Sequence, residues 1–170
     1  GSGSRLAGSR YVLRAIAAGI TTSTDDPDTF AETVWKACAN EAITRQEFQA
    51  AALVAAAISL GLDSPQSRPM DVPPVLWKAV SLVADLPPRG TWHPGPDVVV
   101  ATRTAVSIAD NYKYDVYERL NAQIGTSADP AQSVPAAFAI VRLFADWFAP
   151  FGAASLGGDT SVIAAIAGSI

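Results

Sequence analysis

The sequence has almost none of the residues that form disulfides or soft metal sites. Among its 170 residues there is one cysteine and one histidine. Cys38 alone cannot make an intramolecular disulfide or a cysteine-based zinc site, and a lone cysteine is typical of a reducing compartment. Since no histidine lies near it in sequence, we interpret it as a small buried apolar residue rather than a nucleophile. His93 has no second histidine to share a metal or a triad with, and we expect it to pack within a loop.

Charge is also scarce. Charged residues make up 16 % of the chain, the net charge is −4, and no cluster of lysine and arginine occurs, which argues against a nucleic-acid partner. No secretory signal and no unbroken run of about 18 apolar residues is present, so we expect a soluble, cytoplasmic protein without membrane association. The low charge further suggests that a second chain or segment covers part of the surface.

Apolar residues, by contrast, make up 49 % of the chain, and alanine-rich runs dominate. Because strand patterns are nearly absent, we predict an all-α fold with a single helical domain over residues 1–170. Residues 63–74, 87–96 and 123–135 are expected to be loops. The expected helices are Tyr11–Ala18 ending near Gly19, Phe30–Ala37, Gln46–Leu60 with Gly61 as C-cap, Val75–Leu86, Val98–Ala109 (with a strand at Val98–Val100 as the alternative), Ala136–Trp147, and two more over 149–156 and from Val162 onward.

The most informative stretch is the last one, Leu156–Ile170. Two glycines permit a tight turn before Asp159, and the residues from Val162 onward are small or apolar on every face, as in a buried helix. The acid and the hydroxyls of Thr160 and Ser161 at the start of this helix allow two interpretations. They cap the helix, which spacing alone favours, or they gather oxygens around a hard cation or a phosphate.

The residues Gly157-Gly158-Asp159-Thr160 and Ile163–Gly168 resemble the C-terminal signature GGDTDTIAAIAGA of the ADP-ribosylglycohydrolase family. Ser133–Ala137 is similar to the family's SVPAA segment, at a fitting distance before the glycines. The resemblance covers the middle and C-terminal parts of the family pattern. It implies a compact all-α multi-helix bundle that binds ADP-ribose or a nucleotide-like ligand. It also implies hydrolysis of the bond between ADP-ribose and an acceptor, with two magnesium ions held by carboxylates and threonine hydroxyls.

The C-terminal motif departs from the family at two metal-binding positions. The family offers Asp, Asp and Thr at the first, third and fourth positions of its D-T-D-T core, where this chain has Asp159, Ser161 and Val162. Serine cannot replace the lost charge, valine cannot coordinate a metal, and two neighbouring dications need several anionic ligands. The resemblance therefore implies Asp159 as the catalytic residue, metal ligands Asp159, Thr160 and Ser161, and at most one weakly held magnesium ion for this chain alone.

Two further segments bear on substrate binding. The first residues of the chain resemble the family's GNGAAMR-type loop, which approaches the ADP-ribose phosphates, although an artificial linker has the same composition. Ile43-Thr44-Arg45 resembles the family's I-T-H segment at the start of an Ala-rich helix, so Arg45 stands where a histidine usually faces the ligand. An arginine there holds a phosphate or is a solvated surface residue. The substrate-binding residues implied by resemblance are Gly1, Ser2, Gly3, Ser4 and Arg45.

Two polar stretches admit both a structural and a functional interpretation. Thr24-Asp25-Asp26 is similar to part of the family's TDDT metal motif, but Pro27 interrupts the motif and the triplet follows the Gly-rich loop instead of preceding it. We therefore predict a helix cap. The three tyrosines of the segment 110–121 either pack that segment against its neighbours, which we expect, or stack on an adenine.

These observations lead to one functional hypothesis and two alternatives. The first is magnesium-dependent hydrolysis of an N- or O-glycosidic bond of ADP-ribose or a related nucleoside conjugate. The alternatives are a catalytically degenerate relative that binds ADP-ribose or a nucleotide, and a structural interaction module. Because residue 1 is Gly and the chain stops inside a predicted helix, we expect a processed product or an incomplete part of an ADP-ribosylglycohydrolase-like fold.

Overall fold

Helices provide the regular structure of the chain wherever the computed structural model describes it, which is over residues 13–38, 43–63, 72–112, 114–127 and 129–143. Within these ranges there is no β-strand, only an isolated parallel bridge between Thr44 and Thr91. The predicted all-α fold is confirmed. The helices are α2 (Pro27–Cys38), α3 (Arg45–Asp63), α4 (Val72–Ala84), α5 (Val98–Asn111), α6 (Val116–Gln123) and α7 (Pro130–Leu143), and residues 13–21 are also helical.

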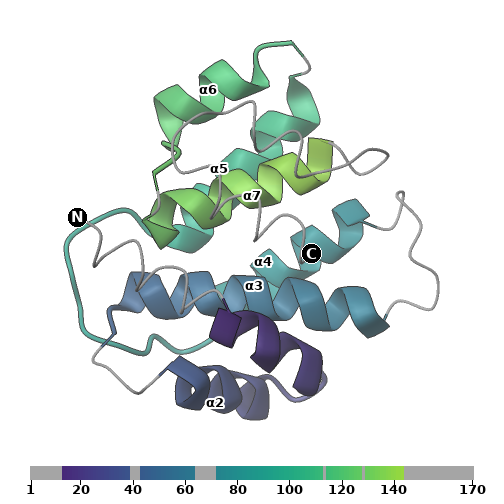
Figure 1. The fold of residues 1–170 in the computed structure, drawn as a ribbon, viewed down its shortest axis with the longest axis vertical. Helices are drawn as coiled ribbons and strands as arrows, with labels where there is room; N and C mark the ends of the chain where they lie inside the picture. The colour runs from purple at the N-terminus through teal and green to yellow at the C-terminus, as the bar shows by residue number, and fades with distance from the viewer. Residues whose placement is uncertain (1–12, 39–42, 64–71, 113, 128, 144–170) are drawn as a thin grey trace.

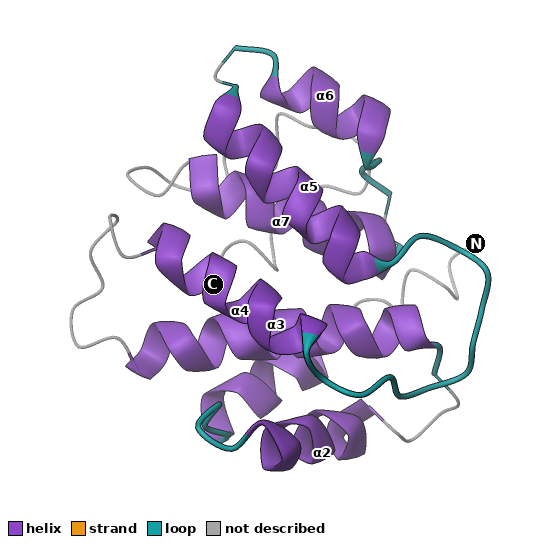
Figure 2. Ribbon diagram, turned by 180° about the vertical axis from the view of Figure 1, so that it is seen from behind, coloured by secondary structure: helices purple, strands orange, loops and turns teal. Residues whose placement is uncertain are grey.

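The α3 helix lies at the centre of the fold (Figure 1). Every side chain from Ala50 to Ala57 is buried, and most of these residues are alanine, whose small side chain lets neighbouring helices approach closely. In both views α2 and the helix at 13–21 lie on one side of α3, and α4, α5 and α7 lie on the other (Figures 1 and 2). Because α3 contacts helices on both sides, segments from several parts of the chain lie next to it.

Gly19 allows the helix at 13–21 to cross close to α3. A Cβ atom at this position would lie 2.7 Å from the carbonyl oxygen of Ala55 and 2.9 Å from the Cβ atom of Ile58. Since a helix backbone cannot give way as a flexible side chain can, the position requires glycine. The first helix ends close to Gly19, as predicted, but it continues to residue 21 because the glycine serves helix packing and is not the C-cap.

The other half of the fold is built on α5 and α7, with α6 packed against α5. All residues from Ser133 to Val141 are buried, so the segment Ser133–Ala137 lies inside the packed part of α7. At the last turns of the two helices, the Arg142 guanidinium pairs with the Asp110 carboxylate. The buried segment Ser133–Ala137 therefore packs within the described part of the molecule.

Prolines account for two helix boundaries that differ from the prediction. The α4 helix begins at Val72 and α7 at Pro130, inside stretches expected to be loops. A proline in the first turn costs little, because the first amides of a helix have no intrahelical acceptor. The α7 start is reinforced by the Asp129 carboxylate, which accepts a hydrogen bond from the amide of Ala131 at 2.9 Å.

The end of α3 and the start of α5 lie closer to their predicted positions. The α3 helix passes through Gly61 and ends at Asp63, so Gly61 is not its C-cap. Val98–Val100 is the first turn of α5, and the strand alternative is wrong. The helices expected over 149–156 and beyond Val162 lie outside the described residues. Of the helices in the described ranges, none is long and apolar enough to cross a membrane.

The tyrosines near α6 only partly follow the expected packing. Tyr117 packs against the core, and burial raises its pKa. Tyr112 is partly exposed under the Arg119 guanidinium, whose Cζ atom lies 3.6 Å from the ring centroid. Tyr114 is fully exposed, so the expectation that all three rings pack the segment is wrong for this residue.

Candidate functional site

Among the residues expected to act on a ligand, Arg45 is the one that the described part of the chain contains. It is the first residue of α3, and its side chain is exposed. The others lie outside the described residues, namely Gly1, Ser2, Gly3, Ser4, Asp159, Thr160 and Ser161. The site can therefore be built up from the start of α3.

A reciprocal capping box fixes the start of α3. The amide of Glu47 donates to Thr44 Oγ1 at 3.1 Å, and the amide of Thr44 donates to Glu47 Oε1 at 3.1 Å. These two bonds satisfy amides that a helix start otherwise leaves without an acceptor. Because Thr44 immediately precedes Arg45, the cap also fixes the backbone from which the arginine extends.

The connection between α4 and α5 (residues 85–97, here the α4–α5 loop) runs past this end of α3 (Figure 2). The amide of Thr91 donates to the carbonyl oxygen of Ile43 at 2.9 Å, and the amide of Arg45 donates to that of Thr91 at 3.0 Å. Gly90 makes this approach possible. Its φ is 97°, and a Cβ atom there would lie 2.8 Å from the carbonyl carbon and oxygen of Thr44.

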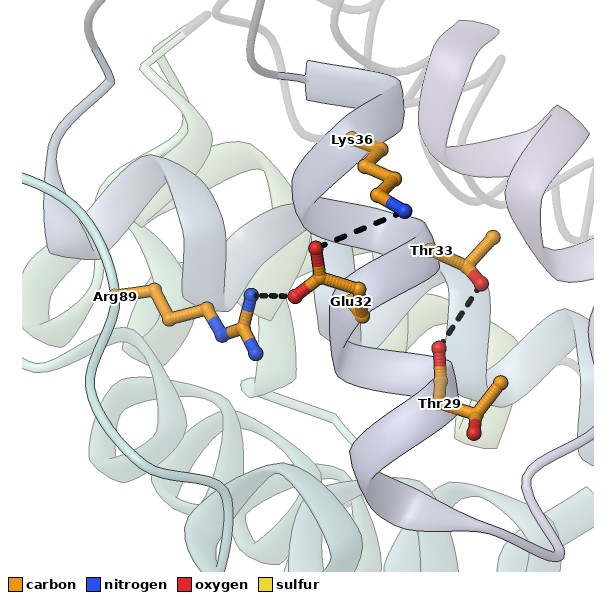
Figure 3. A network of polar contacts seen from close by, with 5 residues as sticks. All are labelled: Thr29, Glu32, Thr33, Lys36 and Arg89. Carbon is orange, nitrogen blue, oxygen red and sulfur yellow. Dashed lines mark hydrogen bonds and ion pairs between the residues drawn. The ribbon is translucent and has the colours of Figure 1, made fainter.

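A second contact ties the α4–α5 loop to α2 (Figure 3). Arg89 Nη1 lies 2.6 Å from Glu32 Oε2, and Lys36 Nζ lies 3.9 Å from Glu32 Oε1. The hydrogen bond from Arg89, with the nearby charges of Arg89 and Lys36, lowers the pKa of the Glu32 carboxyl. Nearby on α2, Thr33 Oγ1 donates to the carbonyl oxygen of Thr29 at 2.9 Å. The Arg89 charge is thus engaged with α2.

Two glutamines of α3 hold the far end of the α4–α5 loop. Gln46 Nε2 donates to the carbonyl oxygen of His93 at 2.7 Å. Gln49 Nε2 donates to Asp97 Oδ2 at 3.2 Å, and Gln49 Oε1 accepts from the amide of Val98 at 3.1 Å. Asp97 also caps α5, accepting from the amide of Val100 at 2.9 Å. These bonds connect the first turns of α3 and α5 through one loop.

A pocket of about 340 Å³ lies between the first turns of α3, the end of α4 and the α4–α5 loop. Phe48, which is buried, forms part of its apolar wall together with residues of α4. Around it stand the charged and aromatic side chains of Arg45, Arg89, Trp92, His93 and Asp97. A concave, partly apolar site with a few polar groups is the usual form of a small-molecule site.

His93 lies in the α4–α5 loop, as predicted, but its ring is not packed there as expected. Its ring is exposed, and Nδ1 lies 2.8 Å from the carbonyl oxygen of Pro94. With the proton on Nδ1, the contact is a hydrogen bond within the loop, and Nε2 of the neutral ring remains an acceptor.

Comparison with known families gives the site its context. A family model described as ADP-ribosylglycohydrolase matches residues 1–170. The chain belongs to this family. No curated protein and no solved structure matches it. The match confirms the family that the C-terminal residues and Ser133–Ala137 indicated, and the all-α fold agrees with it.

The acidic triplet before α2 is a helix cap in this ADP-ribosylglycohydrolase family member. Asp26 Oδ1 accepts from the amides of Asp28 at 3.2 Å and Thr29 at 3.5 Å, and Oδ2 accepts from Thr29 Oγ1 at 2.7 Å. The hydrogen bonds from Thr29 and the weaker one from Asp28 lower the pKa of the Asp26 carboxyl. Pro27 is the first residue of α2, where its missing amide costs nothing. The cap predicted for Thr24-Asp25-Asp26 is confirmed.

Cys38 is buried, as predicted for a small apolar residue. Within the described ranges no group of three or more His, Cys, Asp and Glu side chains could hold a metal ion. Sequence reasoning missed Trp92 and Gln46 as residues of the Arg45 pocket. The glycine- and proline-rich composition of the α4–α5 loop predicts an irregular segment, but it does not predict that this segment lies against α3.

Proposed function

We propose that this ADP-ribosylglycohydrolase-like protein hydrolyses a glycosidic bond of ADP-ribose or a related nucleoside conjugate, with magnesium as cofactor. The observation that carries the proposal is the family match over residues 1–170, together with Gly157-Gly158-Asp159-Thr160 at its C-terminal end. An exposed arginine at the pocket beside α3 is consistent with an anionic ligand. The acceptor from which ADP-ribose is released is left open by this proposal.

The proposed metal ligands are Asp159, Thr160 and Ser161. Their donor atoms are a carboxylate and two hydroxyl oxygens, which are the hard ligands that magnesium prefers, so the set fits the ion in type. It supplies one negative charge, because Ser161 and Val162 stand at the family's Asp and Thr positions. We therefore expect weak magnesium binding by this chain alone. When bound, magnesium supplies orientation of the ribose and activation of water.

The proposed substrate-binding residues complement this acidic set. Arg45 is exposed at the start of α3 and forms no ion pair with a described residue, so its guanidinium can bind the diphosphate. The backbone amides of Gly1, Ser2, Gly3 and Ser4 are the proposed contacts for the same phosphates, because glycine permits close approach. In this arrangement the chain binds and orients the ligand, and Asp159 holds the metal and acts as the catalytic residue.

The experiment is a release assay on two probes, an arginine-linked and a serine-linked ADP-ribosyl peptide, which represent N- and O-glycosides. We expect release that requires magnesium and falls more than about 100-fold in Asp159→Asn. Asp25→Asn is the matched control, because Asp25 belongs to the triplet that serves as a helix cap, and it should retain wild-type activity. Release that is independent of magnesium and of Asp159 would overturn the proposal.

The second candidate is a degenerate relative that binds ADP-ribose without cleaving it, and the substitutions at Ser161 and Val162 favour it. Calorimetry separates it from the first. Binding of ADP-ribose that is independent of magnesium and of Asp159, without release of product, supports the degenerate binder. If titration with neither magnesium nor ADP-ribose produces heat, the result supports a structural interaction module.

A further inference from the structure

The helix at residues 13–21 is apolar on both of its faces. One face packs on α3, where Gly19 leaves no room for a Cβ atom. The opposite face carries Leu13, Ala17 and Ile20 (here the outer row), and Leu13 is 66 % and Ile20 60 % exposed. A helix at the surface normally carries charged and polar side chains on its solvent side. An apolar outer face is instead typical of a helix that another segment covers.

The outer row has the spacing of a helix–helix contact. Its members follow one another at intervals of four and three residues, so they lie along one side of the helix. Arg14, the one charged residue between positions 13 and 21, is half-buried. The small side chain of Ala17, between two larger ones, lets a second helix approach closely. The occupant that fits this row is a helix without charge and with small residues.

Residues 162–170, which lie outside the described residues, have this composition. They include no charged residue, and alanine and glycine supply four of the nine positions. Ile163, Ile166, Ala167 and Ile170 recur at helical spacing and give this segment an apolar side of its own. The two apolar sides match in length and in the alternation of large and small side chains.

The other terminal sequence outside the described residues fits the outer row less well. Residues 1–12 contain two arginines, and residues 144–156 contain an aspartate and a proline, which interrupts a helix. The stretch 144–161 spans about 60 Å when fully extended. A globular chain of this length has a diameter of roughly 40 Å. Residues 162–170 can therefore reach the outer row from the end of α7.

We propose that residues 162–170 form a helix that docks on the outer row of the helix at 13–21. The contact buries apolar side chains of both segments, and because it is intramolecular its effective concentration is high. The docked helix begins directly after Asp159, Thr160 and Ser161, so docking holds this polar set against the described fold. The proposal goes beyond the proposed function and does not depend on hydrolysis.

The test is paramagnetic broadening in the NMR spectrum of the full chain, with a nitroxide label at Thr21→Cys in a Cys38→Ala background. Thr21 is exposed and follows the outer row, and Cys38 is replaced so that the label attaches at one position. We expect the amide signals of residues 162–170 to lose most of their intensity. The matched control is a label at Arg103→Cys, an exposed position of α5 on the other side of α3 (Figure 1), which should leave these signals unchanged.

Urea unfolding gives a second measurement, on protein without a label. Ile20→Ala and Ile166→Ala should each lower the urea midpoint, and the double variant should lower it by less than the sum, because both act on one docked contact. Val100→Ala is the matched control at an exposed apolar residue of α5. It should leave the midpoint unchanged and show no coupling to Ile166→Ala.

The proposal is overturned if the signals of residues 162–170 keep their intensity beside the Thr21 label. It is also overturned if these signals broaden when spin-labelled chain without isotope is mixed with isotope-labelled chain without a spin label, because the occupant is then a second copy. Strictly additive losses in Ile20→Ala and Ile166→Ala would contradict a shared contact. The release assay measures none of these quantities, so the two proposals fail separately.

Discussion

The starts of α2 and α3 use the same chemistry and lead to different surroundings. At α2 the Asp26 carboxylate caps the first amides and accepts hydrogen bonds from Asp28 and Thr29. At α3 Thr44 and Glu47 cap the helix through two reciprocal hydrogen bonds. The start of α2 lies at the surface. The start of α3 is crossed by the α4–α5 loop, from a distant part of the chain, and borders a pocket.

The difference shows that a polar helix start becomes a candidate site through what another segment brings to it. Caps at both helices remove their amides from use by a ligand. At α3 the α4–α5 loop adds Trp92 and His93 beside Arg45, and Gly90 allows the loop to come this close.

The largest effect is expected at Gly90. In Gly90→Ala the side chain must adopt a positive φ and its Cβ atom meets the Thr44 carbonyl group, so the free energy of unfolding should fall by about 2–3 kcal/mol. Urea denaturation measures this. The control is Gly61→Ala, because a Cβ atom at Gly61 meets nothing within 4 Å and the residue lies inside α3. This variant should be more stable than wild type by about 1 kcal/mol. Equal stability of the two variants would contradict the close contact.

A smaller effect is expected from removing the cap of α3. Thr44→Ala should lower the free energy of unfolding by about 1 kcal/mol and also weaken ADP-ribose binding, because the cap fixes the backbone at Arg45. Thr44→Ser keeps the hydroxyl and should retain both the stability and the affinity of wild type. Asp26→Ala removes the cap of α2 and should lower stability while leaving ADP-ribose binding unchanged. A loss of ADP-ribose binding in Asp26→Ala would contradict the distinction between the two helix starts.

The smallest effect is a change in the pH dependence of stability through Glu32. Arg89 lowers the pKa of this carboxyl in the folded state below its ordinary value of 4.5. The ion pair therefore stabilises the fold above that ordinary value, and its contribution is lost as the pH falls through the lowered pKa. Glu32→Gln should lose less stability than wild type when the pH is lowered through this range, as thermal unfolding would show. Glu118→Gln, at an exposed carboxylate of α6, should behave like wild type; an unchanged acid response in Glu32→Gln would be evidence against the Arg89 contact.

Much of the fold could be predicted from the sequence, because helix periodicity and caps are local signals. The all-α class, the buried Ala-rich α3 and the cap at Asp26 followed from residues a few positions apart. The boundaries failed where a residue type has two structural uses. Gly61 and Gly19 predict helix ends, although helices run through both residues. Pro73, Pro74 and Pro130 predict loops, although they lie in the first turns of α4 and α7.

The candidate site was predictable only in part. Arg45 was found through the resemblance of Ile43-Thr44-Arg45 to a family segment, and the capping-box pattern of Thr44 and Glu47 is also visible in the sequence. The positions of Trp92 and His93 at the pocket could not be predicted. The α4–α5 loop is held against α3 by hydrogen bonds between residues far apart in the chain. The roles assigned to the remaining residues stay predictions, namely those of Gly1, Ser2, Gly3, Ser4, Asp159, Thr160 and Ser161.

Calorimetric titration of ADP-ribose into wild type, Arg45→Gln and Asp26→Asn is the measurement that tests the central contrast most directly. We expect Asp26→Asn to bind ADP-ribose like wild type and Arg45→Gln to bind it about tenfold more weakly. Equal affinity of all three proteins, or a loss confined to Asp26→Asn, would contradict the assignment of the α3 start as the ligand site.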